Sequence, residues 1–311
     1  MIRKDQLPNV WGDNWDTEAT PVDIAVGQDR EPCRMVLCDT GDRSMFMLDS
    51  ADGYTLSPFD ENMHITIAEG ATLELYRLQG ITKSTPSITS LKVDMLTGSR
   101  LTLNTITLGG PHTRNNVVIR MHGEHCEVQA DGLYLIDRDQ QCDNYIFVEH
   151  AKPHCKSREL YKGIMDDSAR ARFNGHVLVQ DGAIKTEAYQ TNRNILLTSK
   201  AHVDTRPFLE IYNDDVKCSH GSTIGQLDEQ ALFYMQTRGI SQRTAMTMLS
   251  YAFCDEVIRA ITIDSLRDAV GDMVKKRLHG ELSPSCDECA IQCTTPCNGE
   301  GANFRIDPDK L

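Results

Sequence analysis

Residues 213–225 read NDDVKCSHGSTIG and place a thiol and an imidazole two residues apart, at Cys218 and His220. If this stretch is a strand, residues i and i+2 point to the same face, so the two side chains lie close together. A thiolate and a neutral imidazole are both good ligands for iron and for iron–sulfur clusters. Two ligands are too few for a stable site, so the others would have to come from sulfide or from a second chain.

A structural interpretation of the same residues stays open. Val216 and Cys218 would then face the protein core, and His220 would be a turn residue bonded to the backbone. Free cysteine is among the most buried residue types. For Cys126 and Cys155, which follow comparable turns, we expect this role, as part of an interior ladder.

The end of the chain carries four further cysteines in the stretch CDECAIQCTTPC. Four thiolates suit a tetrahedral zinc ion or an iron–sulfur cluster. The candidate ligands are Cys286, Cys289, Cys293 and Cys297. The alternative is a tail of free thiols, which would be liable to oxidation.

Alternating amides occur at Gln190, Asn192 and Asn194, within the stretch QTNRN. They could form a binding surface, but we expect an amide ladder or turn bonds within the fold.

Three other residues, Glu149, His150 and His154, could be read as a metal cluster with the two histidines at i and i+4. A lysine and a proline stand between the histidines and argue against the helix that this spacing needs.

The composition narrows the class of partner and the compartment. The chain has 311 residues and a formal net charge of −13, which argues against nucleic acid or an anionic membrane as the main partner. We see neither a signal peptide at the start nor an apolar run near the roughly 20 residues that span a bilayer. Eleven cysteines, an odd number, indicate free thiols or metal ligands. We therefore expect a cytoplasmic protein, or one of an organelle matrix.

The elements that position these residues are mostly strands. From about residue 56 to 226 the chain consists of short alternating segments rich in Val, Ile, Leu and Thr, separated by Gly, Asp and Asn. Turns recur about every 25–29 residues, ending at Leu73, Leu101, Cys126 and Cys155, which favours a β-solenoid over a sandwich. A jelly roll is the competing all-β fold. Residues 1–55 form a short N-terminal segment whose strands cannot be placed.

Residues 227–280 show the residue pattern of helices, and residues 281–311 form the cysteine-rich tail. Asp228, Ser241 and Asp264 are candidate N-caps of three helices, and glycines at 239 and 280 suit two of the ends. One apolar stripe is expected on the second helix, formed by Ala245, Met248, Leu249, Ala252 and Phe253. A second stripe on the third helix consists of Val270, Met273, Val274 and Leu278. Either stripe could pack on the solenoid or on a partner.

Two long stretches of the sequence together carry a resemblance to a known family. VEHAKPHCKSRELYKGIMDDSARARFNGHVLVQDGAIKTEAYQTNRNILL, followed by PFLEIYNDDVKCSHGSTIGQLDEQALFYMQTRGI, resembles the SufB/SufD family of iron–sulfur cluster assembly proteins, and is closer to its SufD branch. The resemblance covers roughly residues 60–280. It implies a right-handed parallel β-helix followed by a small helical C-terminal segment, so the fold class is mainly β.

The resemblance also implies partners and a role. Such proteins pair through their β-helices as SufB and SufD, each binds a SufC ATPase through its C-terminal helices, and a cluster is built on the assembly and passed on. The position that matches His220 lies near the SufB–SufD interface and is implicated in assembly, and Cys218 matches a nearby thiol. This chain lacks a GxxxxGK[ST] phosphate loop, so ATP chemistry would come from a partner.

We therefore expect a non-catalytic scaffold subunit that holds a transient cluster or iron at its interface with a SufB-like partner or with a second copy of itself. A structural homodimer without a cluster is one alternative. Another is a carbohydrate-active β-helix enzyme, which would need a row of exposed carboxylates. The acidic pairs Asp166/Asp167 and Asp214/Asp215 look like turn formers instead.

Overall fold

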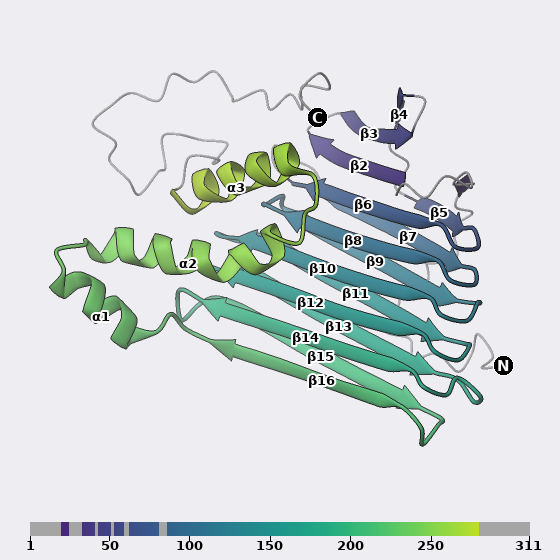
Figure 1. Ribbon diagram of the computed structural model, residues 1–311. Helices are drawn as coiled ribbons and strands as arrows, with labels where there is room; N and C mark the ends of the chain where they lie inside the picture. Colours follow the sequence, from purple (N-terminus) through teal and green to yellow (C-terminus); the bar gives the residue numbers. More distant parts are fainter. Residues whose placement is uncertain are drawn as a thin grey trace.

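The computed structural model describes the backbone of residues 20–24, 33–40, 43–50, 53–58, 62–80 and 86–279. Side chains are described for residues 33–35, 63–80 and 86–279. Most of this part of the chain is extended, and three helices follow the last strand (Figure 1).

Two sheets contain all the described strands. Sheet A has seven strands, in the spatial order β1 (Thr20–Ile24), β5 (Asn62–Ile67), β7 (Ser87–Met95), β9 (His112–Met121), β11 (Gln141–His150), β13 (Arg170–Val179) and β15 (His202–Ile211). Sheet B has nine, in the order β16 (Lys217–Gly225), β14 (Glu187–Leu196), β12 (Lys156–Met165), β10 (Glu127–Ile136), β8 (Arg100–Thr107), β6 (Thr72–Gln79), β2 (Cys33–Thr40), β3 (Arg43–Ser50) and β4 (Gly53–Pro58).

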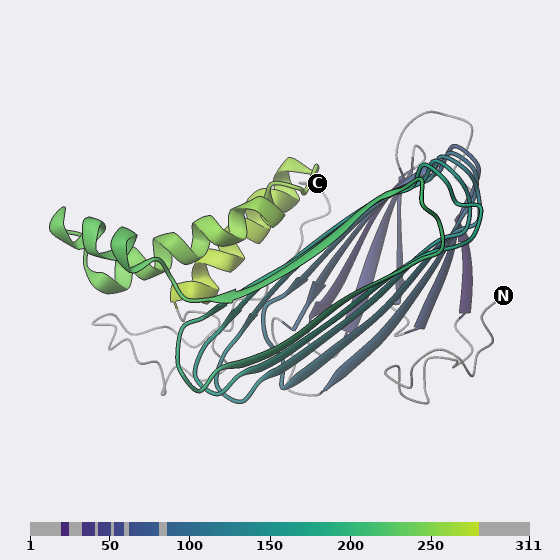
Figure 2. The same ribbon diagram turned by 90° about the horizontal axis from the view of Figure 1, so that it is seen from below.

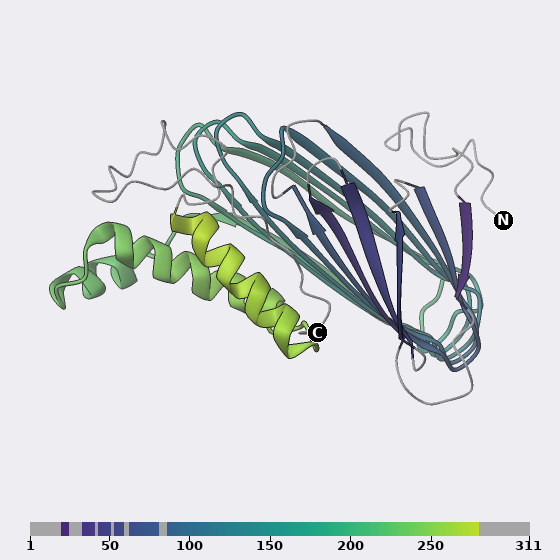
Figure 3. The same cartoon turned by 90° about the horizontal axis from the view of Figure 1, so that it is seen from above.

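Successive strands alternate between the two sheets, so from β5 onward each strand pairs in parallel with the strand two places later in the chain. The chain therefore coils, and each coil stacks on the previous one, as the views along the stack show (Figures 2 and 3). Only β2, β3 and β4 pair antiparallel among the described strands. The predicted parallel β-solenoid is confirmed, and the jelly-roll alternative is wrong, because a jelly roll pairs its strands antiparallel.

From β6 onward, where the side chains are described, alternate residues of each strand face the space between the sheets and form ladders of side chains in register. One such ladder on sheet B consists of Leu73, Leu101, Val128, Ser157, Ala188 and Cys218. Most of these inward positions belong to one continuous apolar core. Burial of this apolar area is the main stabilising contribution, at about 25 cal/mol per Å².

The register corrects one detail of the expected repeat. Leu101 pairs with Val128, so Cys126 is not the equivalent of Leu73 and Leu101. Cys126 and Cys155 come one step before β10 and β12, and the Sγ atom of Cys126 lies 3.7 Å from the Oγ atom of Ser99. Both thiols are fully buried, so the prediction that they belong to an interior ladder is confirmed.

Helices α1 (Glu229–Thr237), α2 (Gln242–Ile258) and α3 (Asp264–His279) lie on the outer side of sheet B (Figures 1 and 2). The expected caps are present at the first two helices: Asp228 accepts hydrogen bonds from the backbone of Gln230 and Ala231, and Ser241 accepts one from Thr244. A second apolar core joins α2 and α3 to sheet B.

A buried lysine also fixes α2 on the sheet. The Nζ atom of Lys162, on β12, donates to the carbonyl oxygen of Phe253 at 2.9 Å and lies 2.7 Å from a carboxylate oxygen of Glu256. Arg158 and Arg193 approach the same carboxylate at 3.7 and 3.8 Å. The ion pair with Lys162 lowers the pKa of Glu256.

The apolar stripe expected on α2 is only partly buried. Ala245 is buried, but Met248 is 50% exposed and the side chain of Ala252 is also exposed. The buried face instead carries Ser250, Cys254, Val257 and Ile258. The expected stripe therefore packs on the protein only in part, and residues from the C-terminal half of the helix join it to the second core. On α3 the stripe is confirmed at Val270, Met273 and Val274.

None of the helices in the described part of the chain is both long and apolar enough to cross a bilayer. The predicted boundaries at residues 55, 226 and 280 stay a prediction.

Candidate functional site

The solenoid ends at β15 and β16, which are the last strands of their sheets in the described chain. Strand β14 pairs with β12 on one side and β16 on the other, whereas β16 has only β14. Nearly every side chain of β16 is exposed. Its free edge therefore presents backbone N–H and C=O groups that a further strand can bind.

Cys218 and His220 both lie on β16 and face inward, as their register shows. Cys218 pairs with the fully buried Ala188, and His220 pairs with Gln190, which is 1% exposed. Cys218 is half-buried and packs against the interior core, and this burial raises the pKa of its thiol. His220 is exposed, because among the described strands only β14 pairs with β16.

The structure thus places Cys218 and His220 on one face, as the sequence predicts for a continuing strand. The alternative in which His220 is a turn residue is wrong, because His220 lies in the middle of β16. Within the described residues, no group of three or more His, Cys, Asp or Glu side chains is arranged to hold a metal ion. Among the described residues, the two side chains therefore form only part of a coordination site.

The sequence did not single out the residue two strands further in. Glu159 on β12 lies in the same inward-facing row as Gln190 and His220. Gln190 donates from Nε2 to the Oε2 atom of Glu159 at 2.7 Å. Burial raises the pKa of Glu159 to about 8. The only signal in the sequence was an acidic residue at a position that alternates with the outward-facing residues of the strand. Without the register, this position could not be identified as inward-facing.

The amides Gln190, Asn192 and Asn194 are buried and bind within the solenoid, so the binding-surface alternative is wrong. Asn192 donates to the Tyr161 carbonyl at 3.2 Å, and Asn194 donates to Asn192 at 2.7 Å. Tyr134 donates to Asn194 at 2.5 Å. Asn192 and Asn194 thus satisfy one another and their neighbours inside the core, whereas Gln190 bonds to Glu159.

The proposed cluster of Glu149, His150 and His154 is also absent. His150 is fully buried and its Nε2 atom lies 2.9 Å from the Ser157 hydroxyl. His154 is exposed on a turn, where its ring stacks on that of His125 at 4.8 Å. Glu149 pairs with Arg120 at 3.2 Å.

Exposed apolar side chains surround the open end. Ile224 on β16 is 51% exposed, and Phe208 and Ile211 on β15 are 53% and 38% exposed. Tyr212, just after β15, is 56% exposed. Apolar groups in this arrangement are typical of a surface that another protein covers.

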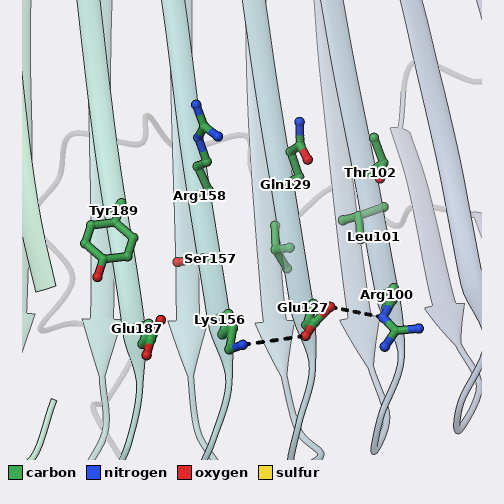
Figure 4. Close-up of a pocket in the computed structure, with 11 residues that line it drawn as sticks. Arg100, Leu101, Thr102, Glu127, Gln129, Lys156, Ser157, Arg158, Glu187 and Tyr189 are labelled. Carbon is green, nitrogen blue, oxygen red and sulfur yellow. Dashed lines mark hydrogen bonds and ion pairs between the residues drawn. The ribbon is translucent and has the colours of Figure 1, made fainter. Parts of the chain in front are cut away.

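The outer face of sheet B carries an open groove of about 390 Å³ across β8, β10, β12 and β14 (Figure 4). Charges alternate along it, and Glu127 binds both Arg100, at 3.0 Å, and Lys156, at 4.0 Å. Glu187 continues the row to Lys217 on β16, at 3.6 Å. These exposed pairs contribute little stability. Their alternation leaves no concentrated charge for an ionic ligand.

Helix α1 forms a second exposed apolar surface. It has no buried residue, and Phe233 and Tyr234 are 68% and 59% exposed. The helix projects away from the sheets beyond α2 (Figures 1 and 2).

The four candidate ligands of the tail lie outside the described residues, and they are Cys286, Cys289, Cys293 and Cys297. Their metal binding stays a prediction.

Comparison with known proteins connects this geometry to a family. Residues 38–253 match the family model described as SUF system FeS cluster assembly, SufBD core domain. The chain belongs to the SufBD family. The matched residues include the whole of β16, with Cys218 and His220, and most of α2.

The SufD branch contains a similar relative. The iron–sulfur cluster assembly protein SufD of Escherichia coli is 42% identical over 173 residues, which are 56% of this chain and 41% of that protein. A SufBD family protein of Synechocystis is 36% identical over 179 residues, or 58% of this chain and 40% of the relative. The chloroplastic protein ABCI7 of Arabidopsis thaliana is 33% identical over 216 residues, or 68% of this chain and 45% of the relative.

The chain thus spans less than half the length of these relatives. The comparisons confirm that it is a SufBD protein most like SufD, within the system for iron–sulfur cluster assembly. This membership argues against the carbohydrate-active alternative.

Proposed function

We propose that this SufBD chain is a non-catalytic scaffold subunit, on which an iron–sulfur cluster is assembled and then transferred as cargo. The observation that supports the proposal best is the inward-facing pair Cys218 and His220 at the uncovered end of the solenoid. A thiolate and an imidazole from one chain form an incomplete ligand set, so the cluster would be held loosely and could be released.

The partner at this end would be a second solenoid, either a SufB-like subunit or a second copy of the chain. A strand added to the free edge of β16 would satisfy its backbone groups. The rest of that solenoid would also cover Ile224 on β16 and the exposed Phe208 and Ile211 on β15. His220 would then lie at the seam, where ligands from both chains meet.

A SufC-like ATPase would bind through the C-terminal helices. Phe233 and Tyr234 on α1 are large, exposed and adjacent, and Met248 on α2 is 50% exposed. Aromatic side chains and methionine are enriched at the centres of protein interfaces. ATP hydrolysis in that partner would drive the conformational change that opens the cluster site.

The cysteines of the tail would hold zinc or a second iron–sulfur cluster, by their residue types alone. A chain truncated at Leu282, with all four tail cysteines removed, should then bind less zinc or iron than the full chain in elemental analysis. Equal metal content in both would make these cysteines bystanders. The complex would act in the cytoplasm or in an organelle matrix, without nucleic acid or membrane as partner.

The proposal is tested by anaerobic co-expression with SufB-type and SufC-type subunits. We expect the three proteins to purify together and to carry iron and acid-labile sulfide, which the complex loses when this chain is omitted. Failure of the chain to purify with either partner, or turnover of a polysaccharide by the chain alone, would contradict the proposal.

A further inference from the structure

The inward-facing row that ends at His220 changes character along the solenoid. Its members from β6 to β16 are Leu75, Leu103, Ala130, Glu159, Gln190 and His220, each in register with the next. The first three are apolar and fully buried. Only the three members nearest the open end are polar, so polarity in this row increases toward the candidate site.

The two buried members of this polar part leave oxygen atoms without partners. Gln190 donates from Nε2 to Glu159 Oε2 at 2.7 Å, and both residues are only 1% exposed. The second oxygen of each side chain, Glu159 Oε1 and Gln190 Oε1, has no hydrogen-bond partner. Each buried polar atom without a hydrogen-bond partner costs roughly 1–3 kcal/mol, so two in one contact call for a physical reason.

The opposite sheet makes room for this arrangement. A Cβ atom at Gly175, on β13, would lie 2.3 Å from Nε2 and 2.7 Å from Oε1 of Gln190. Any side chain at position 175 would therefore displace the carboxamide. Gly175 of sheet A thus leaves the space that the Gln190 carboxamide occupies, and the hydrogen bond to Glu159 of sheet B sets the orientation of that carboxamide.

His220 is the next member of this row after Gln190, on the neighbouring strand β16 toward the open end. Neighbouring strands are about 4.8 Å apart, so an imidazole on β16 can reach the carboxamide below it. Histidines that bind metals usually donate their other ring N–H to a carboxylate or carbonyl oxygen, which fixes the tautomer and the direction of the ring. Gln190 Oε1 is an unused carbonyl oxygen in this location.

We propose that Gln190 and Glu159 are positioning residues for His220. When a partner strand covers the open end, one ring nitrogen of His220 donates its hydrogen to Gln190 Oε1, and the other nitrogen is left to bind iron or the nascent cluster. Glu159 holds the carboxamide in the orientation that keeps Oε1 free. This inference rests on the proposed role of His220, and it adds the residues that would orient the imidazole ring.

A double-mutant cycle tests the inference in the co-expressed complex. The variants are Gln190→Met, His220→Ala and the two together, and the measured quantity is the affinity of the complex for iron(II) under anaerobic conditions. We expect Gln190→Met to weaken iron binding by roughly tenfold, as loss of such contacts usually does. In the His220→Ala background the same substitution should have no further effect, because Gln190 acts through the imidazole.

Equal weakening in both backgrounds would overturn the inference, since it would show a general effect on the fold. If His220→Ala itself leaves iron binding unchanged, the proposed role of His220 fails instead, and the positioning role with it. If Gln190→Met unfolds below the temperature of the assay, Glu159→Leu replaces it in the same cycle. Glu159→Gln is its matched control, because glutamine keeps an acceptor for Gln190 Nε2 and should bind iron like the wild type.

Discussion

His220 and Gln190 are neighbours in register on β16 and β14, yet Gln190 is 1% exposed and His220 is exposed. The difference arises because, in the part of the chain that the structure describes, β14 has a strand on each side and β16 has a strand on one side only. His220 thus occupies an inward-facing position on the last described strand of sheet B, where no further described strand covers it. A partner that continues the stack would turn this exposed imidazole into a buried one.

The open end should be a protein interface, and Ile224 tests this. Ile224→Glu places a charge on the inward face of β16, so it should weaken association with the SufB-like partner by tenfold or more, roughly 1.4 kcal/mol. Its control is Ile88→Glu on β7, because Ile88 is also 51% exposed and lies far from β16. Affinity measured by titration of the purified partner should fall for the first variant only. Similar affinities for the two variants would exclude this end of the solenoid as the interface.

The exposed aromatic pair of α1 should bind the ATPase. Replacing Phe233 and Tyr234 with serine should reduce co-purification of a SufC-type subunit, because both side chains contribute large apolar areas at little cost to the fold. The thermal unfolding midpoint should change little, since α1 has no buried residue. Ile184→Ser, at a turn of the solenoid, is the control. Retention of the ATPase by the double variant would place its site elsewhere.

Lys162 should hold α2 on sheet B. Lys162→Met removes the bond to the Phe253 carbonyl and the ion pair with Glu256, and should lower the free energy of unfolding by roughly 1–3 kcal/mol. Glu256 is 44% exposed and regains water, which limits the cost. The rate of amide hydrogen exchange in the variant, relative to the wild type, should increase more in α2 than in β12. Uniform quickening across both elements would contradict this local role.

Glu159 should make stability depend on pH. Its pKa is raised by burial from 4.5 to about 8 in the folded chain, so between these values the folded state keeps a proton that the unfolded state loses. The free energy of unfolding should therefore fall as the pH rises from about 4.5 to 8. In Glu159→Gln this contribution is absent, so the difference between the variant and the wild type should grow in favour of the variant over that range. Urea unfolding at several pH values measures it, and parallel curves for the two proteins would show that Glu159 is ionised in the fold.

Local signals in the sequence predicted the elements well. Asp228 and Ser241 begin their helices as expected, because an N-cap depends only on a few adjacent residues. The alternation of strand residues likewise predicted the solenoid and placed Cys218 and His220 on one face. The similarity to SufB and SufD makes His220 a candidate from the sequence alone.

Contacts between residues that are far apart in the sequence could not be predicted from such local signals. The contact between Glu159 and Gln190 depends on a register across 31 positions, and the turns vary in length. The same variation misaligned Cys126 with Leu101. The buried face of α2 was predicted only in part for a related reason, because apolar residues occur on more than one face of this helix and contact with the sheet determines which of them is buried.

The most direct test of the account compares His220→Ala with the wild type in the anaerobically purified complex. Its control is His202→Ala, because His202 is an exposed histidine at the same open end whose register position on β15 faces outward. Iron and acid-labile sulfide per complex should fall several-fold for His220→Ala and stay at the wild-type value for His202→Ala. Equal iron and sulfide in all three complexes would remove His220 from the cluster site and contradict the central claim.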